Sequence, residues 1–370
     1  MKILITGAKG FVGRNLTAHL KAAGGHELML YDIDTDETLL GQYAGECDFV
    51  FHLAGINRPK DEEEFMKGNF GFTGSLLECL KAAGNKCPIV TTSSIQAALD
   101  NPYGISKKAG EDLLFDYGRE TGAKIIIYRL PNVYGKWSRP NYNSAVATFC
   151  YNIAHDLPIQ VNEANPLMHL VYIDDLLEEL MRCLEGGEHT GDDGFSYVPT
   201  VSEVHLKDIP KLLYSFREMR QNLQVPDFSE GFEKKLYSTY LSFLDEGDFA
   251  YGLEPHTDNR GSFTEIIRTP DRGQFSVNII KPGITKGNHW HHTKNEKFLV
   301  VKGKGEISFR KIGEEKVITY RVDDRELKVV DIPCGYTHNI TNVGEDDMVT
   351  VMWANEAFDP EHPDTFYEEV

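Results

Sequence analysis

The sequence predicts an α/β domain with a parallel sheet in residues 1–243, followed by an all-β domain in residues 244–370. At 370 residues, the chain exceeds what one hydrophobic core usually serves. Up to about residue 235, short apolar runs alternate with amphipathic stretches, which is typical of parallel strands joined by helices. After about residue 238, β-rich runs follow one another between turn residues, which favours a small barrel or sandwich.

The composition limits the partners and the compartment. Asp and Glu outnumber Lys and Arg by 57 to 38, so the net charge is −19 and a nucleic-acid or anionic-membrane surface is not expected. No run of about 18 apolar residues occurs, and residues 1–10 lack the pattern of a secretory signal. We therefore expect a cytoplasmic protein. The six cysteines are not spaced in pairs, so neither a disulfide framework nor a thiolate zinc site is predicted.

A glycine-rich loop, "TGAKGFVG", directly follows the first strand-like run, "KILI". The helix that the loop opens has apolar residues at four-residue spacing, at Val12, Leu16 and Leu20. Glycines in this context permit a tight turn and the close approach of a pyrophosphate to the helix N-terminus. The loop therefore predicts dinucleotide binding. The expected contacts are Gly7, Lys9, Gly10, Phe11, Val12 and Gly13.

Two residues give conflicting predictions for the cofactor. Asp32 ends the second strand, where an acid bonds a ribose 2′-hydroxyl and repels a 2′-phosphate, which favours NAD. Lys9 could instead pair with such a phosphate, and either side chain could simply be solvated. The segment "HLAG" after the third strand resembles the turn that lines the cofactor, which adds Leu53, Ala54 and Gly55 to the expected contacts.

Tyr103 and Lys107 begin a later helix in the segment "YGISK". Their spacing of four residues puts both side chains on one face of the helix. An ammonium beside a phenol stabilises the phenolate, which brings a pKa of about 10 closer to the working pH for proton transfer. Ser94, or alternatively Ser93, could hydrogen-bond the reacting carbonyl. Such a short spacing is common by chance, but the glycine loop upstream favours catalysis.

These motifs, together with "RLPNVYG" and "VYIDD", resemble the extended short-chain dehydrogenase/reductase family over about 235 residues. The resemblance implies a Rossmann-type doubly wound parallel sheet and hydride transfer on a nucleotide-linked sugar. Ser94 would hold the keto oxygen and Tyr103 would protonate it. Lys107 would tune Tyr103 and hold the nicotinamide ribose. Asn132 would lie against the sugar diphosphate, unless it only braces its loop.

Histidines and a glutamate gather in the segment "GNHWHHTKNEKFLVV". His289 and His291 would lie on the same face of a strand, and Glu296 begins the next apolar run. His338 follows in "IPCGYTHNITN". Three imidazoles and one carboxylate suit a divalent transition metal such as zinc, with room for water or a substrate oxygen. His292 would point to the opposite face, and we leave it out of the set.

The spacing of these groups between Gly283 and Gly303 is similar to the first motif of the cupin family. "PCGYTHNITN" resembles the second motif, although Leu327 stands where that motif usually begins with glycine. The resemblance covers about 120 residues and implies an all-β cupin barrel that binds Zn²⁺. An empty or purely structural site is the alternative. The implied ligands are His289, His291, Glu296 and His338.

The whole chain resembles bacterial capsular-polysaccharide enzymes that join these two domains. The resemblance implies a homodimer that acts on a UDP-2-acetamido-2,6-dideoxy-4-hexulose. A metal beside the ketone would permit inversion at C3 in the cupin, and NADPH-dependent reduction at C4 would trap the product. That product would be UDP-2-acetamido-2,6-dideoxy-L-talose, on the route to UDP-N-acetyl-L-fucosamine. NADP(H) is thus the implied cofactor, while Asp32 leaves NAD(H) open.

Two rival functions and one catalytic group stay open in the sequence. The cupin could be a structural or dimerising module of a simple ketoreductase. The chain could also be a redox or nucleotide-sugar sensor, in which case the Tyr/Lys pair would be idle. The residue that takes the C3 proton is not identified, since Tyr336, Lys294 and Lys297 all lie near the ligands in sequence.

Overall fold

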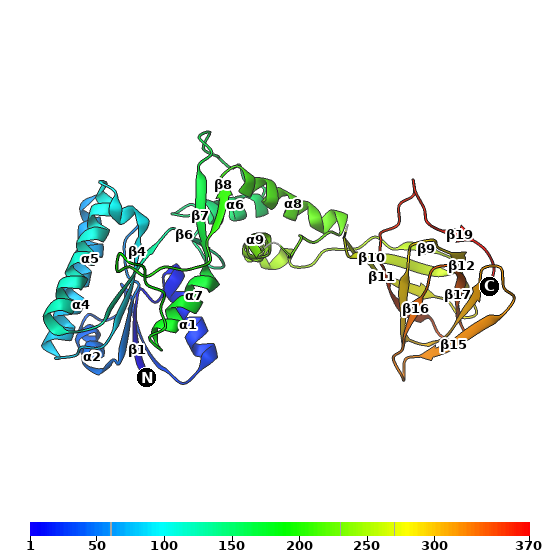
Figure 1. Cartoon of the computed structure of the whole chain (residues 1–370), viewed down its shortest axis with the longest axis horizontal. Helices are drawn as coiled ribbons and strands as arrows, with labels where there is room; N and C mark the ends of the chain where they lie inside the picture. The colour runs from blue at the N-terminus through cyan, green and yellow to red at the C-terminus, as the bar shows by residue number, and fades with distance from the viewer. Residues whose placement is uncertain (60, 230, 270) are drawn as a thin grey trace. The chain divides into compact units, whose positions relative to one another are not determined.

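The computed structural model describes residues 1–59, 61–229, 231–269 and 271–370. Internal contacts divide the chain into two units (Figure 1). Unit 1 comprises Met1–Tyr214 and Phe228–Leu244, and unit 2 comprises Ser215–Asp227 and Asp245–Val370. The expected boundary at residue 243 treats the chain as two continuous pieces, whereas the contacts add a short earlier segment to unit 2.

Unit 1 is built on a five-stranded parallel Rossmann-like sheet in the order β2-β1-β3-β4-β5. The strand order reverses between β1 and β3, so the loops that follow these two strands diverge and leave a crevice at the carboxyl edge of the sheet. The strands are β1 (Lys2–Thr6), β2 (Glu27–Tyr31), β3 (Phe49–His52), β4 (Ile89–Ser94) and β5 (Ile125–Leu130).

Helices cover both faces of this sheet (Figure 1). Because side chains alternate along a strand, Ile3 and Ile5 of β1 pack on one side with α1 and α7, while Leu4 packs on the other with α2, α4 and α5. The doubly wound arrangement follows from strands that are apolar on both faces. The helices are α1 (Phe11–Ala23), α2 (Thr38–Glu46), α4 (Phe72–Ala82), α5 (Pro102–Thr121) and α7 (Ile173–Cys183).

The remaining elements lie outside the five-stranded sheet and outside the two sheets of unit 2. A small mixed sheet joins β6 (Asn132–Tyr134), β7 (Leu167–Tyr172) and β8 (Ser202–His205). Before the strands of unit 2, the chain forms α9 (Gly231–Leu241) and a turn of 3₁₀-helix, η3 (Glu246–Asp248). No helix of the described residues is both long enough and apolar enough to cross a membrane. The other helices are α3 (Glu63–Phe65), the π-helix η1 (Met66–Gly71), η2 (Ile95–Ala98), α6 (Ala145–Ala154) and α8 (Asp208–Asn222).

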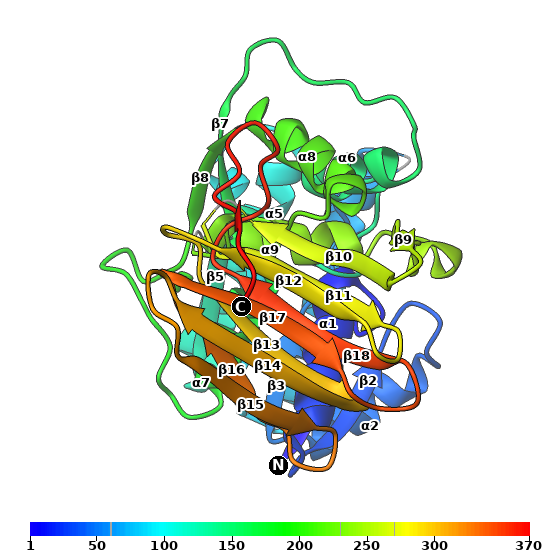
Figure 2. The ribbon, with the colours of Figure 1, turned by 90° about the vertical axis from the view of Figure 1, so that its right-hand side faces the viewer.

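Unit 2 consists of two antiparallel sheets (Figure 2). One has the order β16-β13-β18-β11-β10-β9 and the other β15-β14-β17-β12-β19. Both contribute to one core, in which Ile280 and Phe298 of the first sheet pack with Ile307 and Ile340 of the second. The strands are β9 (His256–Asp258), β10 (Gly261–Thr269), β11 (Gly273–Ile280), β12 (Thr285–Trp290), β13 (Glu296–Lys302), β14 (Lys304–Lys311), β15 (Val317–Asp323), β16 (Val329–Ile332), β17 (Tyr336–Asn342), β18 (Met348–Ala354) and β19 (Phe366–Tyr367).

Candidate active site and metal centre

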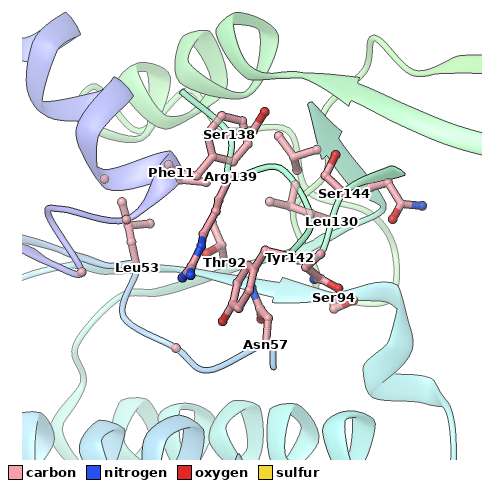
Figure 3. Close-up of a pocket in the computed structure, with 18 of the residues that line it drawn as sticks. Phe11, Leu53, Asn57, Thr92, Ser94, Leu130, Ser138, Arg139, Tyr142 and Ser144 are labelled. Carbon is pink, nitrogen blue, oxygen red and sulfur yellow. The ribbon is translucent and has the colours of Figure 1, made fainter. Parts of the chain in front are cut away.

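A cavity of about 760 Å³ opens in unit 1 at the carboxyl ends of the parallel strands (Figure 3). The loops after β1, β3, β4 and β5 all contribute to its wall. This is the edge where the reversal in strand order leaves room for a ligand. Most of the predicted cofactor and substrate residues line it, namely Gly7, Lys9, Gly10, Phe11, Val12, Gly13, Leu53, Gly55, Ser94, Tyr103, Lys107 and Asn132.

The glycine loop is closely packed against the turn after β3. Gly7 has a φ of 70°, and a Cβ atom there would lie 2.7 Å from the backbone nitrogen of Ala54. A Cβ at Gly13 would lie 2.1 Å from the carbonyl oxygen of Gly7. Both positions therefore require glycine. Ala54 itself does not line the cavity but supports the loop from behind.

The two residues that gave conflicting cofactor predictions have partners within the chain. Asp32 does not line the cavity, and its carboxylate accepts hydrogen bonds from the backbone N–H groups of Lys9, at 2.7 Å, and Ile33, at 2.8 Å. The ammonium of Lys9 forms an exposed ion pair with Asp34. A 2′-phosphate would therefore have to compete with Asp34 for that ammonium.

Helix α5 positions Tyr103 and Lys107. The Asn101 side chain caps the helix by accepting a hydrogen bond from Gly104 N–H at 2.8 Å, and Pro102 occupies the first turn. Tyr103 thus lies in the first turn, where the centre of its ring is 5.6 Å from the centre of the Phe65 ring. One turn later, the Lys107 ammonium donates to the carbonyl oxygen of Thr92 at 3.0 Å.

Burial dominates the electrostatics of this pair. It raises the pKa of Tyr103, while a hydrogen bond with Ser94 acts in the opposite direction. Burial also lowers the pKa of Lys107 to about 8, against the attraction of Glu111. The sequence led us to expect that Lys107 would lower the pKa of Tyr103. The pKa of Tyr103 is instead raised, because the loss of solvent outweighs the hydrogen bond from Ser94.

The neighbouring serines of β4 have different partners. The Ser93 hydroxyl donates to the buried Glu111 carboxylate at 2.6 Å. Arg129 pairs with the same carboxylate at 2.6 Å and lies 3.6 Å from the centre of the Phe195 ring. Ser93 is therefore committed to this buried network. Ser94 accepts a hydrogen bond from Gln96 N–H at 3.2 Å, and its hydroxyl interacts with Tyr103 rather than with Glu111, which favours it over Ser93.

The sequence did not identify the loop of residues 137–144 as part of the cavity. Arg139 and Tyr142 extend into the cavity, with the guanidinium 4.9 Å from the centre of the ring (Figure 3). Trp137 and Asn141 have positive φ angles of 67° and 54°, so the loop follows an irregular path. The segment "KWSRPNYNS" matches no spacing rule, and its only signal was the local mixture of arginine, aromatic and turn residues.

In unit 2, the four predicted metal ligands lie together. One ligand atom from each lies within 4.8 Å of the others. His289 and His338 are directly opposite each other on the paired strands β12 and β17, and Glu296 begins β13 of the other sheet. The two sheets thus bring four chelating groups together, those of His289, His291, Glu296 and His338.

The strand that carries the histidines is less regular than expected. A bulge interrupts its pairing between Gly287 and His289, and Asn288 has a φ of 58°. His291 lies just beyond the last residue of β12, so the alternation of a regular strand does not explain its orientation. His292 is exposed and is not among the four clustered groups.

The chemistry of the four groups fits a divalent metal. Glu296 Oε2 lies 3.5 Å from His291 Nε2 and 3.2 Å from His338 Nε2, and these three buried atoms make no hydrogen bond within the described residues. Burial alone would raise the pKa of Glu296, but the two imidazoles hold it below its ordinary range. Burial lowers the pKa of His289 to about 4. An ionised carboxylate and a neutral imidazole are the forms that bind a metal, and the lowered pKa values of Glu296 and His289 favour these forms.

Comparisons with known proteins identify the family. The model of the "NAD dependent epimerase/dehydratase family" matches residues 3–193. The chain belongs to this family. A second family model, "Polysaccharide biosynthesis C-terminal domain", matches residues 256–366. The expected whole-chain resemblance to capsular-polysaccharide enzymes is confirmed by the relatives described next.

Two of the relatives match the whole chain and a third matches a little more than half of it. The chain is 46% identical over 366 residues to a UDP-2-acetamido-2,6-beta-L-arabino-hexul-4-ose reductase of Pseudomonas aeruginosa, which covers 99% of this chain and 98% of the relative. The solved structure of the capsular polysaccharide assembling protein CapF from Staphylococcus aureus is 53% identical, has a TM-score of 0.94 and covers 100% of both chains. RMD from Pseudomonas aeruginosa, solved in complex with NADPH, is 25% identical, has a TM-score of 0.50 and covers 59% of this chain and 84% of RMD.

Proposed function

We propose that the chain is a bifunctional UDP-sugar enzyme. Its cupin inverts C3 of a UDP-2-acetamido-2,6-dideoxy-4-hexulose, and its reductase unit then reduces C4 with NADPH. The product is UDP-2-acetamido-2,6-dideoxy-L-talose, which leads to UDP-N-acetyl-L-fucosamine for capsular polysaccharide. The observation that carries the reductase is the cavity in which Ser94, Tyr103 and Lys107 adjoin the glycine loop. The named activity of the relative from Pseudomonas aeruginosa supports the 4-keto substrate.

In the reductase unit, each residue has a defined task. A nicotinamide bound along the glycine loop supplies the hydride. Ser94 donates a hydrogen bond to the keto oxygen, and Tyr103 delivers the proton to that oxygen. The raised pKa of Tyr103 keeps the phenol protonated before the reaction, as a general acid requires. The buried ammonium of Lys107 then stabilises the phenolate that remains.

The pKa of Lys107 predicts an alkaline limit to reduction. As the pH rises through about 8, the free enzyme loses the ammonium charge, so kcat/KM for reduction should fall with an apparent pKa near 8. Nearby His52, whose pKa burial lowers to about 3, stays neutral throughout this range. The Lys107→Arg variant keeps its charge, and its limit should move upward by about one unit or more. An identical pH profile in both proteins would contradict this assignment.

A second prediction for unit 1 concerns Asp32 and the preference for NADPH over NADH. Replacement by alanine removes a negative charge near the expected site of the ribose 2′-substituent, so the ratio of kcat/KM for NADPH to that for NADH should rise about tenfold. Asp34→Ala serves as a matched variant, since it frees Lys9 from its ion pair and should also favour NADPH. If steady-state kinetics give the same ratio for Asp32→Ala and the unaltered enzyme, Asp32 does not select the cofactor.

In unit 2, we propose a cupin barrel whose four clustered ligands hold a divalent ion such as zinc. An ion bound there supplies a Lewis acid for the C4 carbonyl and so makes the C3 proton more acidic. Lys297 is a poor candidate for the proton acceptor, because it is exposed and pairs with Asp331. Lys294 and Tyr336 stay open. Tyr336 is two residues from His338 on β17, which puts it on the same face as that ligand.

One experiment separates this function from a ketoreductase with a structural or dimerising cupin. The enzyme is incubated with the 4-keto sugar in deuterated water without nicotinamide. The proposal predicts deuterium at C3, whereas the alternative predicts none. NMR of the product from the complete reaction then identifies the inverted and the reduced carbon. Sedimentation of the purified protein tests the homodimer, which stays a prediction.

A further inference from the structure

Residues 364–369 lie along the outer edge of the histidine strand in unit 2. Within this segment, β19 pairs with β12 in antiparallel register, so that Tyr367 is opposite His289 and Phe366 is opposite Trp290. The segment is distant in sequence from all four ligands, yet it adjoins the strand that supplies one of them directly. None of its own side chains belongs to the ligand cluster.

The backbone of Asp364 determines how His291 faces the cluster. Its carbonyl oxygen accepts a hydrogen bond from His291 Nδ1. An imidazole that donates from Nδ1 carries its free lone pair on Nε2. His291 Nε2 is the atom that lies 3.5 Å from Glu296 Oε2 without a hydrogen bond. The carbonyl therefore fixes the tautomer and the direction of this ligand.

The side chain of Asp364 holds the turn that follows His291. Its carboxylate accepts hydrogen bonds from three consecutive backbone N–H groups, those of His292 at 2.9 Å, Thr293 at 2.8 Å and Lys294 at 2.9 Å. Burial opposes ionisation, but these bonds keep the pKa of Asp364 below its ordinary range. His291 lies beyond the end of β12, so this carboxylate supplies the order that the strand no longer provides.

The other end of the segment is fastened beside two more ligands. Glu368 N–H donates to the carbonyl oxygen of Asn288 at 3.0 Å, and its carbonyl oxygen accepts from the Thr337 hydroxyl. Asn288 and Thr337 directly precede His289 and His338 in the chain. Arg310 completes the attachment with bonds to the Glu368 carboxylate at 2.8 Å and to Glu369 O at 2.6 Å.

We infer that residues 364–369 are the support of the metal centre and that Asp364 is a positioning residue for His291. The inference rests on the proposed metal site. Because the segment orients the ligands, its docking and metal binding favour each other, and each must strengthen the other by the same factor. Removal of the Asp364 carboxylate should therefore lower the affinity for the metal. Removal of the metal should make residues 364–369 less firmly docked on β12.

The test measures zinc affinity directly, by competition with a chromophoric chelator. Asp364→Ala should bind zinc about 10- to 100-fold more weakly than the unaltered protein, the usual effect of losing a group that orients a ligand. Asp364→Asn keeps one oxygen that accepts from the turn, so its loss should be smaller. His362→Ala is the matched control, because His362 is exposed in the same connection and bonds only Asp359 among the contacts described. It should bind zinc like the unaltered protein.

Two further measurements distinguish the ways in which the idea can fail. In the unaltered protein, amide hydrogen exchange over residues 366–368 should be slower with zinc than with a chelator; equal rates would overturn the coupling. Loss of the three hydrogen bonds to the carboxylate should lower the stability of metal-free Asp364→Ala by less than its loss of zinc affinity, as measured by melting. A loss of stability as large as the loss of affinity would make Asp364 merely structural. If the unaltered protein takes up no zinc, the proposed metal site itself fails. If it binds zinc and Asp364→Ala binds equally well, only the present inference is wrong.

Discussion

Tyr103→Phe should lose C4 reduction by roughly 10²- to 10⁴-fold, the usual contribution of a positioned proton donor. The substitution removes only the phenolic oxygen, so the ring can still pack against Phe65. Reduction is measured as oxidation of NADPH in the presence of the keto sugar. Cofactor binding should change little, because the glycine loop is untouched.

The same variant separates the two proposed reactions. Deuterium exchange at C3 should continue in Tyr103→Phe, since the ligand cluster belongs to unit 2. Ser94→Ala provides a comparison, because it removes a hydrogen bond to the keto oxygen and leaves the proton donor in place. Its loss of reduction should be smaller. If Tyr103→Phe reduces the keto sugar at the normal rate, Tyr103 is not the acid.

Sequence spacing was sufficient where regular secondary structure determines geometry. The four-residue interval between Tyr103 and Lys107 fixes one face of a helix, and the glycine loop fixes a strand, a turn and a helix in order. Both features line the cavity of unit 1. The ligand spacing from His289 to His338 also led to a real cluster, because paired strands bring distant residues opposite each other.

The spacing failed where burial or irregular backbone decides. The pKa of Tyr103 depends on how much solvent the surrounding fold removes, which a motif does not contain. Arg139 reaches the cavity from a loop with positive φ angles, so no period could place it. Asp364 supports His291 from 73 residues away through its backbone carbonyl, which any residue carries. Only the three-dimensional pairing of β19 with β12 identifies this contact.

Glu296→Gln should abolish C3 exchange and release the metal. Glu296 supplies the only negative charge among the four ligands, and its replacement leaves three imidazoles to hold a divalent cation in a buried site. We expect metal affinity to fall at least about 100-fold and deuterium incorporation at C3 to fall to background. Metal content is measured by elemental analysis of the purified protein, and exchange by NMR.

Glu306→Gln is the matched control, because it makes the same change of charge in the same unit at an exposed ion pair with Arg321. It should keep both metal and exchange. Chelation of the unaltered enzyme should reproduce the loss seen in Glu296→Gln, and added zinc should restore exchange only in the unaltered enzyme. NADPH binding in all three proteins reports whether unit 1 is intact. Exchange that persists in metal-free enzyme would mean that the four clustered side chains serve another purpose than inversion at C3.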